Sequence, residues 1–331
     1  MKINRWRGGP PYLRRTPTSR PPVLAAALLA LSFWFSFSAF GQGSIVDAVR
    51  ARIAQKDLPG AEQIVRAFQA RTGPRPDLAA ALSWLARGWL DARNPDRADT
   101  FAQEAAGMSA RFLTAMKLDD DPWLPTAVGA AIEVHAGVLA ARGERAEALT
   151  YLREQLRVYA ATSLPERISK NINLLTLEGK PAPALDTTQW IGAARPPSLA
   201  GLRGRPVLLF FWAHWCSDCK AEVGIIAELR KTFAAQRLAV IGPTRFYGYV
   251  QSGEEAPPQR ERRYIEQVRG QYYTALADMP VPLSSANFVN YGASSTPTLV
   301  LIDRAGVVRW YHPGSATGTE LTARIRQLLA K

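Results

Sequence analysis

Residues 206–219 read PVLLFFWAHWCSDC, and this stretch decides the fold of the part of the chain that contains it. Residues 206–213 are an apolar run of strand length without polar alternation, which is typical of a strand covered on both faces. Apolar side chains then recur at helical spacing over residues 220–229. The sequence predicts a strand, a turn and a helix, with Cys216 at the helix N-terminus and Cys219 one turn inside it.

A cysteine at a helix N-terminus has the chemistry of a nucleophile. Unpaired backbone N–H groups and the positive end of the helix dipole stabilise an anion there. They lower the pKa of a thiol from about 8.5 toward neutrality. The spacing of three residues also puts both sulfurs on one helix face, within reach of a disulfide. We expect an exposed Cys216 to attack a partner disulfide and a shielded Cys219 to resolve the mixed disulfide.

Three other interpretations of the cysteine pair stay open at this point. A zinc site needs two more ligands, and the spacing of His135, His214 and His312 suggests none. A structural disulfide that closes so small a ring adds little stability. A peroxiredoxin would have a threonine three residues before its reactive cysteine, where this chain has Ala213. Thiol–disulfide exchange is favoured over all three.

Length and composition set the outer limits. The chain has 331 residues, of which 47% are hydrophobic and 21% charged, so about two domains of roughly 150 residues are expected. This balance excludes a disordered chain and a polytopic membrane protein. The net charge is +13, but residues 1–20 hold six basic residues and no acid, and the other basic residues are interleaved with the 28 acidic ones. No clustered basic face is expected, which argues against a nucleic-acid partner.

The N-terminus has the pattern of an export signal. After the basic residues comes the uncharged stretch 23–40, VLAAALLALSFWFSFSAF, followed by Gly41 at a position suited to cleavage. An uncleaved anchor is the second interpretation and a buried core helix the third. We expect residues 1–41 to be a signal peptide or membrane anchor that places the protein in the periplasm or another extracytoplasmic compartment, where disulfides persist.

Residues 44–178 are rich in Ala, Leu and Arg at helical spacing. We expect helices to begin at Pro59, Pro95 and Pro122 and turns at Gly60, Gly73 and Gly143. Three similar segments each place an alanine after a short turn, at Ala61, Ala98 and Ala148. The segments predict an irregular, tetratricopeptide-like array of helical hairpins. Such an array binds another protein in its groove, or serves as a spacer or dimerisation module.

The proline-rich stretch after Gly179 predicts a domain boundary near residue 178. In the second domain, residues 210–222 (FFWAHWCSDCKAE) resemble the active-site strand and helix of the thioredoxin fold, and more narrowly the TlpA/ResA group of thiol–disulfide oxidoreductases. The segment STPT at 295–298, followed by LVLID, resembles the cis-proline loop and closing hairpin. The resemblance covers residues 179–331 and implies a central mixed sheet flanked by helices, preceded here by the helical domain.

The resemblance also implies how substrate is held. Pro297 is expected to be cis, and the Thr296 backbone to pair with an incoming substrate strand. Trp215 is expected to cover the disulfide and to offer partners a flat apolar contact. A trans proline and a merely packed tryptophan are the alternatives.

Glu222 is the candidate proton relay. Thioredoxins have a buried acid on the strand, at the position of Phe210 here, whereas Glu222 matches a glutamate of the ResA-like group. We expect it to exchange the proton of Cys219 with a pKa raised by burial. The alternative is a solvent-facing glutamate that complements the helix dipole.

Three neighbours tune the redox poise. Asp218, where the group usually has proline, is expected to raise the pKa of the thiolate and to stabilise the disulfide. His214 and Lys220 act in the opposite direction. Tyr247 and Tyr249, in a Tyr- and Gly-rich insert, either lie near the site or pack in the core.

The sequence therefore predicts an extracytoplasmic oxidoreductase that reduces disulfides of partner proteins through Cys216 and Cys219. Its redox-active disulfide is the only cofactor expected, with no metal, and the resemblance implies a membrane thiol carrier as electron donor. The alternatives are an oxidase that introduces disulfides and a helical-repeat interaction protein with a redox-sensing CxxC pair.

Overall fold

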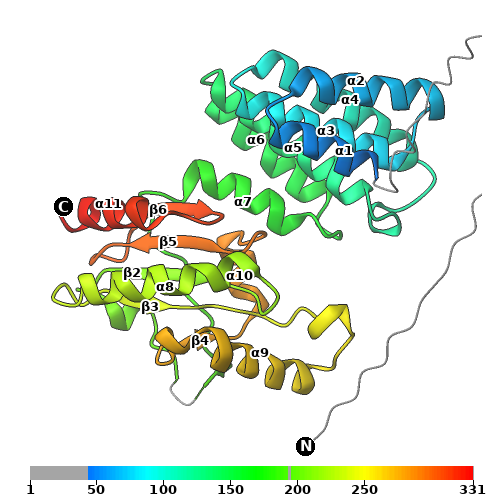
Figure 1. The fold of residues 1–331 in the computed structure, drawn as a ribbon. Coiled ribbons are helices and arrows are strands. Elements are labelled where there is room, and N and C mark those ends of the chain that lie inside the picture. The colour runs from blue at the N-terminus through cyan, green and yellow to red at the C-terminus, as the bar shows by residue number, and fades with distance from the viewer. Residues whose placement is uncertain (1–43, 193–194, 331) are drawn as a thin grey trace, which may run out of the picture. The chain divides into compact units, whose positions relative to one another are not determined.

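The computed structural model describes residues 44–192 and 195–330, and the predicted signal or anchor at residues 1–41 lies outside them. The described chain begins with helices and continues with a sheet flanked by further helices (Figure 1). The helices of the first part are α1 (Ile45–Ala54), α2 (Leu58–Thr72), α3 (Pro76–Asp91), α4 (Pro95–Phe112), α5 (Leu124–Ala141), α6 (Arg145–Val158) and α7 (Pro165–Thr176).

Proline and glycine mark several helix ends, as the sequence predicts. Pro59 and Pro95 lie in the first turns of α2 and α4, where the missing N–H has no intrahelical partner to lose. Gly73 and Gly143 follow α2 and α5 with φ of 71° and 87°, a conformation that favours glycine. The helical nature of residues 44–178 is confirmed.

Two details of that prediction are wrong. Gly60 is no turn residue but lies in the first turn of α2, where its N–H donates to the carboxylate of Asp57. Asp57 caps the helix and so moves the start of α2 upstream of the glycine. Helix α5 begins at Leu124 with Pro125 in its first turn, two residues after Pro122.

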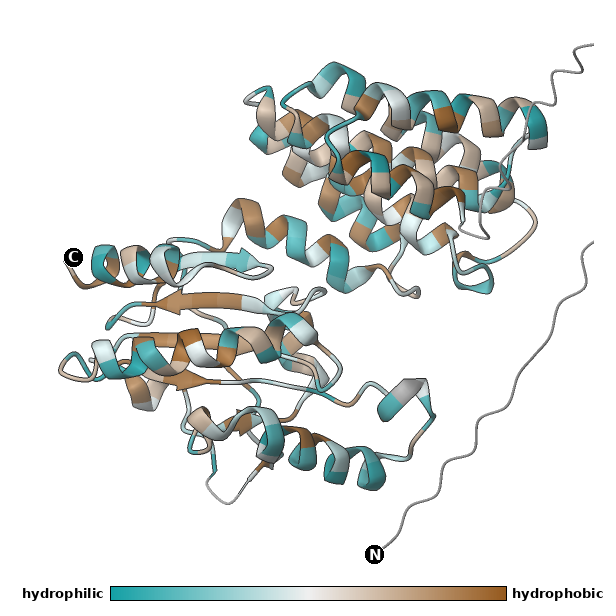
Figure 2. Ribbon diagram, viewed as in Figure 1, coloured by the Kyte–Doolittle hydropathy of each residue, from teal (hydrophilic) through white to brown (hydrophobic). Residues whose placement is uncertain are grey.

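The three alanines of the similar segments lie at helix contacts. Ala61, Ala98 and Ala148 are fully buried, and each is the fourth residue of its helix. Figure 2 shows the apolar residues of the first part gathered on the facing sides of the helices. A tetratricopeptide-like repeat remains a prediction.

Helix α5 has an unusual composition. Among the described residues it is the one helix long and apolar enough to cross a membrane. It packs against α3, α4, α6 and α7, and most of its apolar side chains are buried there. This burial is typical of a core helix.

The second part contains a mixed four-stranded sheet in the order β3-β2-β5-β6. Strand β2 pairs with β3 in parallel and with β5 antiparallel, and β5 pairs antiparallel with β6. The predicted mixed sheet flanked by helices is therefore confirmed. The strands are β1 (Trp190–Ile191), β2 (Val207–Phe211), β3 (Ala239–Ile241), β4 (Val281–Pro282), β5 (Thr298–Ile302) and β6 (Val308–Pro313), and the helices are α8 (Ser217–Thr232), α9 (Pro258–Tyr272), α10 (Ser285–Tyr291) and α11 (Gly318–Leu329).

Both faces of the two central strands are covered, which explains the uninterrupted apolar run of the sequence. Every residue of β2 and β5 is buried. Successive residues point to opposite faces, so Leu208 and Phe210 pack toward α8, α9 and α11, whereas Leu209 and Phe211 pack toward α10. The sheet thus fixes the end of β2, from which the cysteine segment starts.

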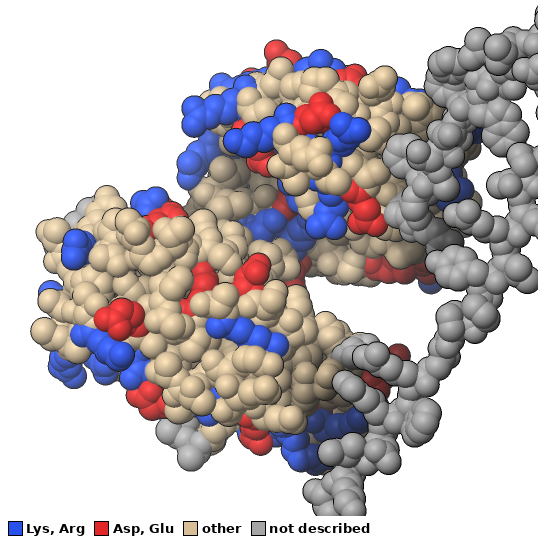
Figure 3. Space-filling view, in the orientation of Figure 1, with Lys and Arg blue, Asp and Glu red and all other residues tan. Residues whose placement is uncertain are grey.

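Charges of both signs are interspersed on the described surface that Figure 3 draws, with Lys and Arg among Asp and Glu. Many of these groups form ion pairs, for example Arg230 with Asp278 and Arg309 with Asp303. The described surface in this view has the mixed pattern that the sequence predicts.

The predicted boundary near residue 178 lies just after α7, and as a domain boundary it remains a prediction. Helix α7 packs against α10. Gly292, which ends α10 with φ of 57°, lies directly against the backbone of α7, so that an added Cβ would be 2.7 Å from the Cα of Lys170. Only glycine fits this approach without a shift of backbone.

We therefore predict that Gly292→Ala lowers the free energy of unfolding by at least about 2 kcal/mol, because it adds left-handed strain and a backbone clash. Urea denaturation of the full chain measures the loss. Gly107→Ala is the matched control, since Gly107 lies in α4 with open space around it. It should be neutral or stabilising by up to about 1 kcal/mol. Equal midpoints for Gly292→Ala and the wild type would contradict the prediction.

Candidate active site

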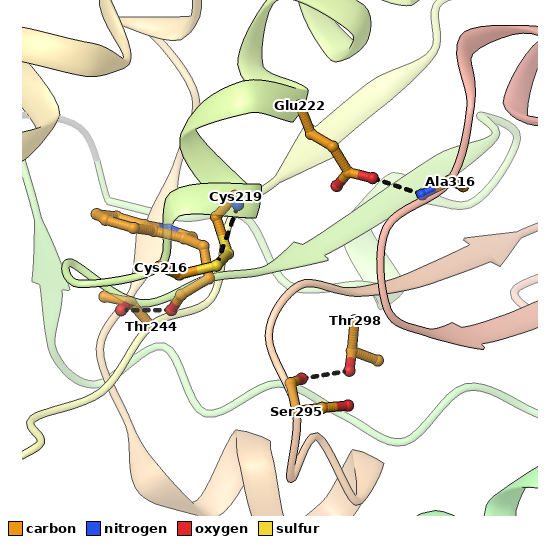
Figure 4. The surroundings of a disulfide bond; sticks show 8 residues. Cys216, Cys219, Glu222, Thr244, Ser295, Thr298 and Ala316 are labelled. Atoms are coloured by element: carbon orange, nitrogen blue, oxygen red, sulfur yellow. Dashed lines mark hydrogen bonds between the residues drawn. A yellow bond between two sulfur atoms is a disulfide. The ribbon is translucent and has the colours of Figure 1, made fainter. Parts of the chain in front are cut away.

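Cys216 and Cys219 form a disulfide at the start of α8 (Figure 4). Cys216 is the N-cap residue, and its sulfur accepts a hydrogen bond from the N–H of Cys219 at 3.0 Å. The turn is closed by the Cys216 N–H, which donates to the carbonyl of Ala213. The predicted strand, turn and helix are confirmed, with the first sulfur where backbone donors stabilise an anion.

The segment between β2 and the cysteines is held by hydrogen bonds to the loop that follows β3. The hydroxyl of Thr244 donates to the Trp212 carbonyl at 2.9 Å, and the Trp212 indole N–H donates to the Gly242 carbonyl at 2.9 Å. Both Trp212 and Thr244 are fully buried. These bonds hold the end of β2 and hence the position of Cys216.

The exposure of Cys216 differs from the expectation. Cys216 is 3% exposed and Cys219 is fully buried, so the first cysteine is not an exposed turn residue. The cause is packing, because Cys216 belongs to the same apolar cluster as Trp212 and Ala213. Burial by itself raises the pKa of a thiol, so the helix N-terminus must offset this effect if Cys216 is to be a thiolate at neutral pH.

Glu222 lies one turn beyond Cys219 on α8 and is 3% exposed, so a solvent-facing role is excluded. Its Oε1 accepts a hydrogen bond from the Ala316 N–H at 2.6 Å, whereas its buried Oε2 has no partner among the described residues (Figure 4). Burial raises the pKa of Glu222 to about 7, and the charge of Asp218 adds to the shift. The carboxyl can therefore hold or release a proton near neutrality.

His214 is buried rather than available as a cation. It is 1% exposed, and its Nε2 lies 3.2 Å from Oε1 of Glu261 on α9. Burial lowers the pKa of His214, so the ring is neutral at pH 7. The expectation that His214 adds positive charge near the thiolate is therefore not supported by its surroundings.

Glu261 is a site residue that sequence reasoning missed. It is fully buried and accepts hydrogen bonds from the N–H groups of Tyr247 and Gly248, which join α9 to the loop after β3. In the sequence it reads only as an acid that interrupts the basic run Arg260–Arg263. Glu261 lies four and seven positions before the buried Ile265 and Val268, on the same face of α9, and this spacing was the available signal. A charged residue on a surface helix is nevertheless the commoner interpretation.

The Tyr-rich insert does lie at the site. The rings of Tyr247, Tyr249 and Tyr264 stand edge-on to His214, with centroids 5.3 to 5.5 Å away. Trp215 is 48% exposed and stands edge-on to Tyr247. A partly exposed aromatic side chain next to Cys216 fits a contact surface for partners better than it fits a core residue.

The other residues that the sequence predicts at the site differ in their exposure and contacts. Asp218 is exposed, whereas Lys220 is partly buried with its Nζ 4.5 Å from the centroid of Tyr272. The Thr296–Pro297 peptide bond is cis in the structure, and Pro297 is buried. Among the described residues, no group of three or more His, Cys, Asp or Glu side chains is placed to hold a metal ion.

We predict that the titration of Glu222 makes stability depend on pH. Because the pKa of Glu222 is about 7 when folded and about 4.5 in an exposed carboxyl, the folded state binds more protons between these values. The stability contribution is therefore fully present below pH 4.5, is lost as pH rises toward 7, and stays lost above it. Glu222→Gln should flatten the fall of Tm between pH 5 and pH 7.

Glu228→Gln, at an exposed position of the same helix, is the control for this prediction and should keep the wild-type profile. Thermal unfolding of the three oxidised proteins at each pH gives the comparison. Parallel profiles for Glu222→Gln and the wild type would rule out a raised pKa at this carboxyl.

The comparisons with known proteins concern the same part of the chain. The AhpC/TSA family matches residues 179–252. The thiol:disulfide interchange protein DsbE of Xylella fastidiosa (strain Temecula1) is 27% identical over 154 residues, which are 46% of this chain and 70% of that protein. The thioredoxin-like protein YneN of Bacillus subtilis is 28% identical over 149 residues, 45% of this chain and 78% of its own length. A solved thioredoxin-like superfamily protein, SPOA0173, is 24% identical with a TM-score of 0.39 and covers 46% of this chain and 97% of its own.

The residues matched by the family model, 179–252, include β2 and the cysteine pair at the start of α8. Each of the matches given above spans less than half of the chain. Ala213 stands three residues before Cys216, so the threonine expected of a peroxiredoxin is absent despite the family match. In its C-terminal half, this chain is a thiol–disulfide oxidoreductase of the thioredoxin fold.

Proposed function

We propose that the protein reduces disulfides of other proteins outside the cytoplasm. The observation that carries the proposal is the Cys216–Cys219 disulfide at the N-terminus of α8, on the same helix as a buried carboxyl that titrates near pH 7. Relatives named as thiol:disulfide interchange proteins support protein thiols and disulfides as substrates.

In the proposed reaction the reduced Cys216 thiolate attacks a substrate disulfide. A bond forms between Cys216 and one substrate sulfur, the substrate S–S bond breaks, and the leaving sulfur takes up a proton. Cys219 then loses its proton and attacks the Cys216 sulfur, which releases the second substrate thiol. Two electrons and two protons pass to the substrate, and the Cys216–Cys219 disulfide remains.

Glu222 is proposed as the group that takes the proton of Cys219. The structure holds Cys219 in the disulfide, and in the reduced protein the proton is proposed to pass to Glu222 through a bridging water. The free Oε2 offers the acceptor, and a pKa of about 7 matches the neutral pH at which the step takes place.

The charges around the cysteines support reduction as the direction. Asp218 and Glu222 lie on the first turns of α8, and His214 is neutral, which leaves Lys220 as the one nearby cation at the start of this helix in the described chain. Negative charge disfavours the thiolate and so stabilises the disulfide relative to the dithiol. Such a pair gives its electrons away readily.

An extracytoplasmic location is proposed from the basic and apolar pattern of residues 1–41, as a cleaved signal or an uncleaved anchor. A membrane thiol carrier is proposed as the electron donor, because the sequence has no nucleotide-binding motif.

The helical residues before 178 are proposed to bind a partner or to position the substrate. Glu166 on α7 forms an ion pair with Arg245, whose guanidinium lies over the ring of Tyr247 at 5.1 Å. Tyr247 in turn contacts His214 and Trp215. The first part of the chain therefore touches the loop that borders the cysteines, which favours a role in the same reaction.

We predict that Cys216→Ser abolishes the reduction of insulin by the protein, since the one remaining thiol, Cys219, is fully buried and has no second cysteine with which to form a disulfide. Cys219→Ala should accumulate mixed disulfides with partner proteins that a thiol reductant releases. The double variant is the control and should capture nothing. Undiminished insulin reduction by Cys216→Ser would overturn the proposed function, and unchanged partner capture by it would favour an interaction protein.

We predict a reduction potential below about −200 mV for the Cys216–Cys219 pair, on the reducing side of protein disulfide isomerase. Equilibration with glutathione buffers measures it. Asp218→Asn should raise the potential by roughly 10 to 20 mV, the effect of one exposed charge, and Glu228→Gln should leave it unchanged. A potential near about −120 mV would favour the oxidase instead.

A further inference from the structure

A cavity of about 620 Å³ lies beside the disulfide, and the reaction described above does not use it. Its inner side is formed by the residues that flank the cysteine pair, namely His214 and Trp215 before it and Lys220 after it. The loop residues Tyr249 and Gln251 line the cavity on another side. The cavity is therefore lined by residues that lie only one or two positions from the two cysteines in the sequence.

Helix α9 turns a single face to the cavity. The lining residues of α9 are spaced three or four positions apart, which places them on one side of the helix: Tyr264, Gln267, Val268, Gln271 and Tyr272. The many charged residues of α9, from Arg260 to Arg269, are not among them. A strongly charged helix thus presents uncharged amide and aromatic groups at this place.

Lys220 is the one charged side chain that lines the cavity among the described residues. No carboxylate of the described chain forms an ion pair with it, and its ammonium group rests near the ring of Tyr272. The amide groups of Gln251, Gln267 and Gln271 supply further N–H donors. The cavity therefore has the donors and the positive charge that suit a carboxylate, and it lacks an acid of its own.

Exposed aromatic side chains form part of the lining. Trp215 and Tyr272 are 48% and 43% exposed and belong to the few large apolar side chains of the described chain that face solvent. Two aromatic side chains beside a cation suit a peptide ligand. The rings pack on the peptide backbone, and the cation binds one side chain of the peptide. The volume lies in the range of ordinary ligand pockets.

We propose that this cavity is a specificity subsite that binds the Asp or Glu side chain of a substrate protein next to the cysteine under attack. The proposal rests on the proposed function and adds a substrate class to it. The carboxylate accepts hydrogen bonds from the Lys220 ammonium and the glutamine amides, and the flanking peptide packs between Trp215 and Tyr272. A lysine at the same substrate position meets a like charge instead.

The test uses three disulfide-bonded peptides that are identical except for one residue beside the reactive cysteine, which is Glu, Gln or Lys. The reduced full-length protein should reduce the Glu peptide with a kcat/KM about 3 to 5 times that for the Gln peptide, as expected for one partly exposed ion pair. The Lys peptide should be slower still, and added salt should shrink the differences. Equal rates for all three would overturn the subsite.

Two variants separate binding in the cavity from a change in thiol reactivity. Lys220→Met changes the reactivity toward every peptide alike but should bring the Glu to Gln ratio to about one. Gln267→Glu, at an exposed position of the lining, should reverse the preference in favour of the Lys peptide. Lys231→Met, at the far end of α8, is the control that should keep the wild-type ratio.

The outcomes distinguish this inference from the proposed function. Reduction of all peptides with a ratio that Lys220→Met leaves unchanged would remove the subsite and keep the oxidoreductase. No reduction of any peptide or of insulin would remove both.

Discussion

The rest of the site depends on two opposing effects on the pKa of the Cys216 thiol, namely burial and the helix N-terminus. Cys216 is almost fully buried, which disfavours its thiolate, and it caps α8, whose N–H groups favour it. In the disulfide form the Cys219 N–H donates to the Cys216 sulfur, and a backbone donor at this place favours the thiolate after reduction. Strand β2 sets the position of Cys216, because the cysteine segment starts where this buried strand ends.

Two buried carboxyls, Glu222 and Glu261, have different surroundings. Glu222 keeps one oxygen free of partners and titrates near neutrality, which suits a proton carrier. Glu261 is bonded by two backbone N–H groups and faces a neutral His214, which suits a structural anchor for the loop of Tyr247. The same residue type thus serves chemistry or architecture according to how many of its lone pairs are satisfied.

The loop of Tyr247 links the cysteines to the rest of the chain. On one side it contacts His214 and Trp215, and on the other Arg245 reaches Glu166 of α7. The cavity lined by Lys220 and α9 begins at the same loop. The cysteine segment, the cavity and the helical part therefore all contact one short loop, and the CxxC motif alone does not reveal this.

The strand, turn and helix at the cysteines and the helical character of residues 44–178 follow from the sequence alone, whereas the mixed sheet was expected from the resemblance to a known family. Periodicity and the CxxC spacing are local properties, so they survive in the linear chain. Only the tertiary structure decided the burial of Cys216, the neutrality of His214, the role of Glu261 and the cavity beside Lys220. Each of these features results from packing between elements far apart in the sequence, such as α8 and α9. Desolvation by this packing shifts the pKa values of buried groups, and the neighbouring residues of the sequence do not reveal it.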